Sequence, residues 1–241
     1  MTNRLSIIIP TLNEADNIIS LINHLDTNAS LENISEIILV DGGSIDGTTE
    51  KVNAYVNSSD LNAFKSKITL INAPRGRSKQ MNLGAKYATG NILYFLHADS
   101  FPPKNFDQLI IEQIAHGHKA GCFRLQFDNN HWWLRLASWL TQFSWRACRG
   151  GDQSQFITKA LFEEIGGYDE SFIIYEDNIL INELYARKEF VVINKKLITS
   201  ARLYEKYGIW KVQYHFWAIY VKKWFGASAT DLYNYYKKHF V

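Results

Sequence analysis

The 241-residue chain has few cysteines, no long apolar run and no sign of a targeting segment. Its two cysteines, Cys122 and Cys148, show neither metal-type spacing nor a disulfide framework, which indicates a reduced, cytoplasmic setting. No stretch reaches the roughly 18 apolar residues of a membrane span, so we expect no transmembrane helix. The N-terminus leads from four residues directly into a strand pattern, without the apolar region of a signal peptide.

The chain also lacks a strong charge of either sign. A formal net charge of +2, with no dense Lys or Arg block before the tail, argues against a nucleic-acid partner. Linkers rich in Gly, Ser or Pro are absent, which favours one main domain over 1–205 and a C-terminal helical appendage over 206–241. Hydrophobic residues make up 46% of the chain, enough for a full core, and aromatic residues crowd into 132–145 and 204–240.

The first hundred residues alternate between strand patterns and helical patterns. In the clearest strand, 91–96, large apolar residues follow one another without the alternation of a half-exposed strand, which is typical of a strand buried on both faces. The other strands expected here are 5–10, 34–40 and 68–72, and the expected helices are 18–25, one from 48 onward, and 78–88. This order predicts right-handed βαβ units in an α/β fold, with a mostly parallel central sheet flanked by helices.

The pattern is less regular after residue 100. The expected helices are 106–114, part of 131–146, 161–165, 175–187 and aromatic-rich helices over 209–240. The expected strands are 121–127 and two edge strands, 190–193 and 198–203. The second half is therefore expected to complete the same α/β domain before the C-terminal helices begin.

Polar residues follow three of the predicted strands. Asp41 ends the second strand in a glycine-rich loop, and Asp99 follows the strand at 91–96. Since open α/β sheets bind ligands at the carboxyl ends of their strands, Asp99 is a candidate ligand for a hard cation. The alternative is that Asp99 begins a turn before Pro102. After the first strand, Asn13 is a candidate N-cap for the next helix.

Six motifs in this order resemble the family 2 glycosyltransferases, which are inverting enzymes with the nucleotide-binding GT-A fold. The motifs occupy 6–14, 40–48, 82–90, 95–99, 166–169 and 176–177. The resemblance implies a GT-A catalytic domain over 1–205, with a nucleotide-binding half at 1–100 and an acceptor and sugar half at 101–205. More narrowly, 77–82, 97–99, 151–153 and 200–202 resemble a bacterial subgroup labelled arsenosugar-biosynthesis-type glycosyltransferases.

The resemblance implies transfer of a sugar from a UDP- or GDP-linked donor to a hydroxyl acceptor. Asp41 would accept hydrogen bonds from the nucleobase, and Arg75 and Arg77 would add positive charge at the diphosphate unless they form a solvated basic loop. The nucleotide contacts that it implies are Pro10, Thr11, Asn13, Glu14, Asp41, Arg75, Arg77, Asn82, His97 and Ala98. Helix capping is the alternative for Asn13 and Glu14.

Asp99 is the metal ligand that the resemblance implies. Mg²⁺ or Mn²⁺ would be held by one or two carboxylates together with the two phosphates of the donor. Most of the family carries Asp-x-Asp at this place, whereas this chain has His97 where the first aspartate would stand. This difference lowers the local negative charge and can favour Mn²⁺ over Mg²⁺.

Asp177 is the general base that the resemblance implies. The alternative is a carboxylate that interacts with a helix dipole. Glu176 either tunes Asp177 through like charge or faces solvent. The residues expected around the sugar or acceptor are Gly151, Asp152, Gln153 and Arg202. An unliganded turn is the alternative for 151–153, and a phosphate contact for Arg202. No residue is placed as the nucleophile of a covalent intermediate, which favours single displacement with inversion.

The tail has an aromatic pattern of its own. An apolar stripe at helical spacing consists of Trp210, Tyr214, Trp217, Val221 and Trp224, with lysines nearby. The helix at 210–225 either touches a membrane interface or packs on the core or on a partner subunit of a homo-oligomer. A lipid-linked acceptor would fit the aromatic residues, as would a peripheral position on the inner face of the membrane.

Two other functions stay open. A sugar nucleotidyltransferase has a similar sheet, but it normally carries a Gly-rich signature with a lysine after the first strand, which 11–14 does not supply. A catalytically idle nucleotide-binding or membrane-attached scaffold fits the missing carboxylate at His97. The presence of Asp41, Asp99 and Asp177 argues against such a scaffold.

Overall fold

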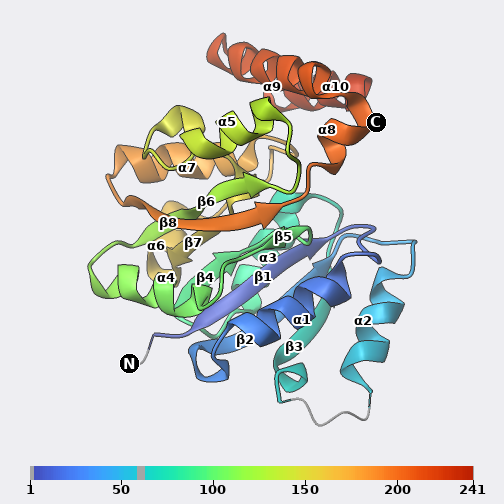
Figure 1. Ribbon diagram of the computed structural model, residues 1–241, viewed down its shortest axis with the longest axis vertical. Coiled ribbons are helices and arrows are strands. Elements are labelled where there is room, and N and C mark those ends of the chain that lie inside the picture. The colour runs from blue at the N-terminus through green and yellow to red at the C-terminus, as the bar shows by residue number, and fades with distance from the viewer. Residues whose placement is uncertain (1–2, 59–62, 241) are drawn as a thin grey trace.

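Eight strands form one sheet in the computed structural model, which describes residues 3–58 and 63–240 (Figure 1). The strand order is β3-β2-β1-β4-β7-β6-β8-β5. The strands are β1 (Leu5–Thr11), β2 (Ile34–Asp41), β3 (Ile68–Asn72), β4 (Ile92–Phe95), β5 (Ser100–Phe101), β6 (Ala120–Phe127), β7 (Gln155–Thr158) and β8 (Phe190–Thr199). The helices are α1 (Ile18–Asn28), α2 (Thr48–Val56), α3 (Arg77–Tyr87), α4 (Phe106–Ala115), α5 (Trp132–Leu140), α6 (Lys159–Ile165), α7 (Glu176–Ala186), α8 (Arg202–Tyr207), α9 (Ile209–Trp224) and α10 (Ala229–Phe240).

The predicted alternation of strands and helices in the first hundred residues is confirmed. β1 pairs in parallel with both β2 and β4, and β2 pairs in parallel with β3. Thr11 at the end of β1 lies opposite Asp41 at the end of β2. Because parallel strands end at the same edge of a sheet, the loops that follow β1, β2 and β4 collect there, where α/β proteins bind their ligands.

β1 is buried on both faces, which explains its continuous apolar run. Ile7 and Ile9 belong to one hydrophobic core, whereas Ile8 belongs to the core on the opposite face together with Met81 of α3. α3 packs so closely on this face that a Cβ on Gly84 would come within 2.5 Å of Ile8 Cγ2. The two cores fix the sheet between layers of helices and thereby fix the loops at its edge.

The second half of the sheet is mixed, and one strand prediction is wrong. β7 runs antiparallel to β4 and β6, while β6 and β8 pair in parallel. The sequence predicts separate edge strands at 190–193 and 198–203, but β8 is one unbroken strand between β6 and β5, and α8 follows it. The exposed polar residues 194–196 resemble a turn. A register shift between Phe123 and Arg124 of β6 accommodates them within the ladder.

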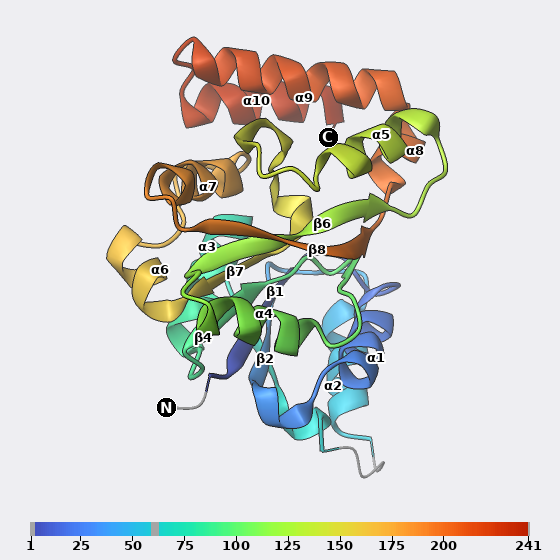
Figure 2. The ribbon, with the colours of Figure 1, turned by 60° about the vertical axis from the view of Figure 1, so that its left-hand side comes forward.

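The C-terminal helices lie at one end of the molecule. Figure 2 shows α9 and α10 side by side, beyond α5 and α7. A small core of Phe172, Ile219 and Leu232 joins them to the segment before α7. The predicted boundary at residue 205 falls inside α8, and Val241 lies outside the described residues. In the part of the chain that the structure describes, no helix is long and apolar enough to cross a bilayer.

Candidate active site

Two loops are cross-linked at the carboxyl edge, after β1 and β2. The side-chain oxygen of Asn13 accepts a hydrogen bond from Ile45 N at 3.0 Å, and Asn13 N donates to Ser44 Oγ at 2.9 Å. The prediction that Asn13 caps the next helix is wrong, because α1 begins at Ile18 with Asn17 in the N-cap position. Asn13 instead has a positive φ of 57°, which turns the chain so that its side chain meets the neighbouring loop.

Asp41 organises the second of these loops. Its Oδ2 accepts hydrogen bonds from the backbone of Gly43 and Ser44 at 2.8 Å each, and its Oδ1 accepts one from the Ser44 hydroxyl at 2.5 Å. Only the remaining acceptor capacity of this buried carboxylate is free for a nucleobase. The sequence did not single out Gln80, which donates to the carbonyls at the ends of β1 and β2 at 2.8 and 2.7 Å.

Arg202 connects the two sides of the carboxyl edge. Its guanidinium pairs with both carboxylate oxygens of Glu14, and its Nη2 lies 3.2 Å from Asp99 Oδ2. Asp99 is mostly buried, and burial raises the pKa of its carboxyl group, against the opposing charges of His97 and Arg202. Arg202 thus pairs with Glu14, a predicted nucleotide residue, and with Asp99, the predicted metal ligand. The two carboxylates share this one cation.

The short 3₁₀ turn at 151–153 lies between His97, a predicted nucleotide contact, and Asp177, the predicted base. His97 Nδ1 lies 3.6 Å from Asp152 Oδ1. At the preceding position, a Cβ on Gly151 would come within 2.1 Å of Asp177 Oδ2. Glycine therefore leaves the space that the Asp177 carboxylate occupies.

α7 begins with two carboxylates in different surroundings. Glu176 is fully buried, so the alternative that it faces solvent is wrong. Its Oε1 lies 3.3 Å from Arg77 Nη1, and its Oε2 has no hydrogen-bond partner among the described residues. Burial raises the pKa of Glu176 to about 7, although Arg77 opposes the rise. Asp177 is partly exposed, and its Oδ1 accepts a hydrogen bond from Asn178 N at 2.8 Å.

Two predicted nucleotide residues have side chains that the protein itself occupies. Asn82 donates through Nδ2 to Tyr168 O and to Glu170 Oε1 at 2.9 Å each, and it accepts from Tyr168 N at 2.9 Å. Both amide hydrogens are thereby used to hold a turn, which leaves none for a nucleotide. The side chain of Ala98 lies in the hydrophobic core, so its backbone alone is available to a ligand.

Gln153 also differs from its predicted role beside the sugar. It is buried, accepts a hydrogen bond from Arg149 Nη1 at 2.6 Å and donates to Cys148 O at 2.6 Å. Arg149, which no sequence motif singled out, is buried as well and donates to the carbonyls of Thr141 and Phe143 at 2.6 and 2.8 Å. Buried polar groups pair internally, and here they hold the loop that presents Asp152.

The remaining predicted nucleotide residues lie at or near the carboxyl edge. Pro10 and Thr11 are the last residues of β1. Arg75 is exposed in the loop between β3 and α3, as the alternative of a solvated basic loop expects. Arg77 begins α3 and is instead paired with Glu176, so the two arginines of this loop differ in their surroundings.

The residues around Asp99 fit a divalent cation that takes some of its ligands from the protein and the others from a diphosphate. Within residues 3–58 and 63–240, no group of three or more His, Cys, Asp or Glu side chains is arranged to hold a metal ion by itself. Asp99 would supply one carboxylate, and the charges of His97 and Asp152, which contact each other, act on it. Mg²⁺ and Mn²⁺ are commonly bound by one or two carboxylates plus substrate phosphates, which this donor set can provide.

Curated proteins with related sequences are glycosyltransferases. The chain is 32% identical over 110 residues to the glycosyltransferase AglE of Haloferax volcanii, covering 46% of this chain and 35% of that protein. It is 24% identical over 195 residues to the undecaprenyl-phosphate 4-deoxy-4-formamido-L-arabinose transferase of Proteus mirabilis, covering 79% of this chain and 55% of that protein. The chain therefore spans between about a third and about half of the length of these relatives.

Solved structures share the fold at low sequence identity. S. aureus TarS 1–349 in complex with UDP has a TM-score of 0.64 and 18% identity, covering 86% of this chain and 63% of that chain. The mannosyltransferase PcManGT from Pyrobaculum calidifontis, in complex with GDP-Man and Mn²⁺, has a TM-score of 0.68 and 16% identity, covering 98% and 70%. The predicted GT-A fold is thereby confirmed. The sequence pattern of the family described as "Glycosyl transferase family 2" matches residues 6–182, which is most of the chain. The chain therefore belongs to that family.

Proposed function

We propose that the chain is an inverting glycosyltransferase that moves a sugar from a nucleotide-diphosphate donor to a hydroxyl acceptor. The observation that carries this proposal is the close approach of Gly151 to Asp177, next to the contact between Asp152 and His97. This arrangement brings the proposed base beside His97 and Asp152, two residues proposed to help Asp99 hold the cation. Direct attack on the donor sugar requires such an arrangement.

In this proposal the donor nucleoside lies over the cross-linked loops after β1 and β2, against Asn13, Glu14 and Asp41. Arg77 and Arg202 provide positive charge for the diphosphate. Both already form ion pairs with carboxylates, so phosphate oxygens would replace Glu14 and Asp99 as partners of Arg202. An arginine fork suits this exchange because it binds carboxylate and phosphate oxygens with the same geometry.

A divalent cation, Mg²⁺ or Mn²⁺, would neutralise charge on the departing diphosphate. Asp99 would hold it, and Asp152 and His97, which contact each other, would be candidate further ligands. The imidazole of His97 replaces a carboxylate here, and imidazole ligands suit transition metals better than they suit Mg²⁺. We therefore expect Mn²⁺ to support activity at least as well as Mg²⁺.

Asp177 acts as the general base in this proposal and accepts the proton of the acceptor hydroxyl as that oxygen attacks the anomeric carbon. Glu176 takes a different part because it is buried and paired with Arg77. With its pKa raised to about 7 by burial, Glu176 retains a proton over part of the neutral range and limits the negative charge beside Asp177. A single displacement of this kind inverts the anomeric configuration.

The names of related proteins support the substrate classes. Two TarS structures contain UDP or UDP-GlcNAc, and the PcManGT structure contains GDP-Man, which favours a UDP- or GDP-linked donor. The Proteus mirabilis relative is named for undecaprenyl phosphate, which favours a lipid-linked acceptor. We place the enzyme in the cytoplasm, peripheral on the inner face of the membrane. Homo-oligomer formation and the arsenosugar-type subgroup stay predictions, and we take no acceptor from the subgroup label.

Incubation with UDP- and GDP-sugars, each with Mn²⁺, Mg²⁺ or EDTA, tests the proposal. We expect metal-dependent release of UDP or GDP with one class of donor, and faster release when an amphipathic alcohol is added. Proton NMR of the product should show an inverted anomeric centre. Release of pyrophosphate from a nucleoside triphosphate and a sugar phosphate would indicate a nucleotidyltransferase instead. Donor binding without turnover, with any acceptor, would indicate a scaffold.

A further inference from the structure

Six of the seven tryptophans in the chain are half or more exposed, with exposed fractions between 50% and 84%. They lie on α5, in the loop that follows it and on α9: Trp132, Trp139, Trp145, Trp210, Trp217 and Trp224. We call these six residues the aromatic face. Tryptophan is highly buried on average, and a contiguous exposed apolar surface marks a site of interaction.

α9 leaves its apolar stripe largely exposed. The exposed members of the stripe are Trp210, Tyr214, Trp217, Val221 and Trp224. The opposite side of α9 is buried through Val212 and Ile219, so the helix packs on the protein with that side and leaves the stripe largely exposed. Trp133 of α5 joins the two helices, since its ring centroid lies 5.3 Å from that of Trp210 and 5.9 Å from that of Trp217. α5 and α9 therefore present one continuous surface.

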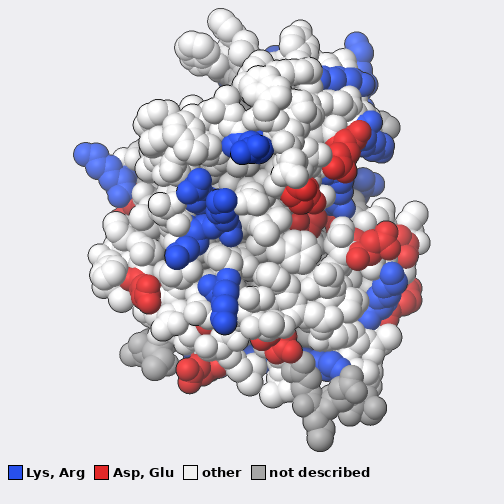
Figure 3. Space-filling view, viewed as in Figure 1, with Lys and Arg blue, Asp and Glu red and all other residues white. Residues whose placement is uncertain are grey.

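Four of the elements that carry or border this surface have charge of one sign. α5, α9, β6 and β8 contain no Asp or Glu. Their Lys and Arg residues are Arg124, Arg135, Lys195, Lys196, Lys211, Lys222 and Lys223. Figure 3 shows Lys and Arg side chains gathered over β6 and β8, with no acidic side chain among them. Exposed indoles bordered by cations are complementary to an anionic membrane surface.

A pocket of about 510 Å³ opens between α5 and the strands β6 and β8. Its lining combines three cations and two exposed indoles: Arg124, Arg135, Lys196, Trp132 and Trp139. Arg124 donates to Asn194 Oδ1 at 2.9 Å, while its buried Nε has no hydrogen-bond partner among the described residues. Convergent cations beside indole rings fit a phosphate group that is attached to an apolar chain.

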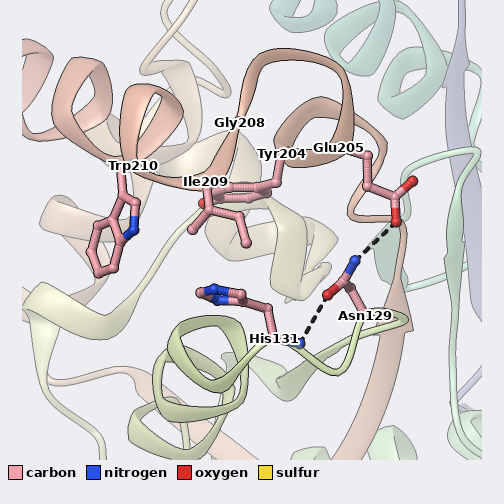
Figure 4. A pocket seen from close by; sticks show the side chains of 7 residues that line it. All are labelled: Asn129, His131, Tyr204, Glu205, Gly208, Ile209 and Trp210. Atoms are coloured by element: carbon pink, nitrogen blue, oxygen red, sulfur yellow. Dashed lines mark hydrogen bonds between the residues drawn. The ribbon is translucent and has the colours of Figure 1, made fainter.

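A second cavity, of about 440 Å³, marks the border of the aromatic face with α8. Figure 4 shows Trp210, Ile209 and Tyr204 around His131 in this cavity. Glu205 also lines it, and its Oε1 accepts a hydrogen bond from Asn129 Nδ2 at 3.0 Å. Acidic residues thus lie just outside the four cationic elements, Glu205 on α8 and Asp128 directly after β6.

We propose that the aromatic face docks on a membrane surface that contains anionic lipid. The indoles enter the headgroup region, the cations meet lipid phosphates, and the pocket between α5 and the strands holds one of these phosphates. A second copy of the chain is the competing occupant. A two-fold interface brings the same patch of both subunits together, and here it would oppose cations to cations. The charge therefore favours the bilayer.

The docked surface leads to the proposed acceptor side of the active site. Tyr220 of α9 donates to Asn178 Oδ1 at 3.3 Å, and its ring centroid lies 5.3 Å from that of Tyr175. Tyr175 and Asn178 flank the first residues of α7, which include Asp177. A membrane-bound acceptor would reach the base beside α9. This delivery of acceptor rests on the proposed transferase function, whereas docking does not.

Flotation of the full chain with lipid vesicles tests the proposal. We expect binding to vesicles of phosphatidylcholine with phosphatidylglycerol and weaker binding to phosphatidylcholine alone. The double variant R135Q/K196Q should lose about thirtyfold in affinity for the anionic vesicles, from the usual contribution of two cations near a charged surface. W217A/W224A should also bind more weakly. Matched controls are K86Q/K104Q, with the same charge change, and Tyr87→Ala, which removes an exposed aromatic side chain from α3.

Failure of the unmodified chain to bind anionic vesicles would overturn the proposal, as would equal losses in the control variants. A dimer that W217A/W224A dissociates, with unchanged vesicle binding, would assign the face to a second copy. Thermal shifts with UDP- and GDP-sugars on the same proteins separate this result from the transferase proposal. Lost docking with intact nucleotide binding supports the inference, and docking without nucleotide binding would contradict the proposed function alone.

Discussion

The carboxyl edge of the sheet and the aromatic face differ in the pairing of their charges and in the exposure of their apolar side chains. At the edge, opposite charges are partly buried and paired within the protein, as in Arg202 with Glu14 and Asp99. On the aromatic face, indoles are exposed, and α5 and α9, which carry most of them, contain Lys and Arg but no Asp or Glu. A ligand at the edge must therefore replace existing partners, whereas an occupant of the face meets groups that the protein leaves unmatched.

Removing the proposed base should cause the largest loss of activity at the carboxyl edge. Asp177→Asn is expected to lower kcat by about 10²- to 10⁴-fold, because an amide cannot accept the acceptor proton. Donor binding and vesicle docking should be unchanged. Steady-state kinetics with a saturating donor measures the effect, and Glu183→Gln, an exposed carboxylate on the same helix, is the control. Retention of more than a tenth of the activity would exclude Asp177 as the base.

Glu176, the buried neighbour of Asp177, should make the stability of the protein depend on pH. Burial raises the pKa of Glu176 from 4.5 to about 7, so between these values the folded chain holds a proton that the unfolded chain has lost. The free energy of unfolding should therefore fall by about 3 kcal/mol as the pH rises through this range. Glu176→Gln should remove the fall. Urea titrations between about pH 5 and 8 test this, and equal slopes in both proteins would contradict it.

The contact between the two parts of the site can be tested with neighbouring glycines. Gly151→Ala places a Cβ within 2.1 Å of Asp177 Oδ2, so the carboxylate must move and kcat should fall by about 10²-fold. At Gly150 a Cβ would meet nothing within 4 Å, so Gly150→Ala is the matched control. Similar activity in both variants would show that the position of Asp177 in this structure is not the working one.

Arg202 should affect donor binding more than turnover. Arg202→Ala leaves Glu14 and Asp99 without their shared cation and removes a phosphate partner, so we expect KM for the donor to rise about tenfold or more. Arg202→Lys should recover part of the loss, since lysine keeps the charge without the fork. Arg187→Ala, which also removes ion pairs, should leave KM unchanged. An unchanged KM in the Arg202→Ala variant would remove Arg202 from the donor site.

The two regions should also differ in their sensitivity to salt, although this effect should be smaller than those of the substitutions. Exposed cations are screened within a Debye length of about 8 Å at physiological ionic strength, whereas partly buried pairs are screened much less. Raising the salt concentration should therefore weaken vesicle docking more than it weakens donor binding. Parallel flotation and calorimetry across a salt series would measure both. Equal sensitivity would mean that the two regions do not differ in the way we describe.

The sequence predicted the features that local patterns encode. Both-face burial of β1, β2 and β4 produced unbroken apolar runs, and these runs located Asp41 and Asp99 at one edge of the sheet. The pairing of Arg202 with Glu14 spans 188 positions, so no local sequence pattern predicts it. The bonds between Asn82 and Tyr168 span 86 positions and were missed for the same reason, whereas Gln153 bonds to residues only four and five positions away, Arg149 and Cys148.

The aromatic stripe on α9 shows where periodicity stops being informative. Helical spacing predicted that one side of the helix is apolar, and the helix is present. Whether that side meets the core depends on what packs against it, and here Val212 and Ile219 on the other side are buried instead. Exposure of the stripe is a tertiary property, so the sequence left the core, a partner and a membrane as open alternatives.

A thermal-shift panel tests the central claim about the carboxyl edge most directly. Each of several UDP- and GDP-sugars is added with Mn²⁺, Mg²⁺ or EDTA to the unmodified chain and to Asp99→Ala. A ligand that binds only the folded state should add about 2.7 kcal/mol at a hundred times its dissociation constant. We predict stabilisation by one class of donor that requires the metal and is lost in Asp99→Ala. Stabilisation that persists in Asp99→Ala, or no stabilisation with any donor, would contradict the account.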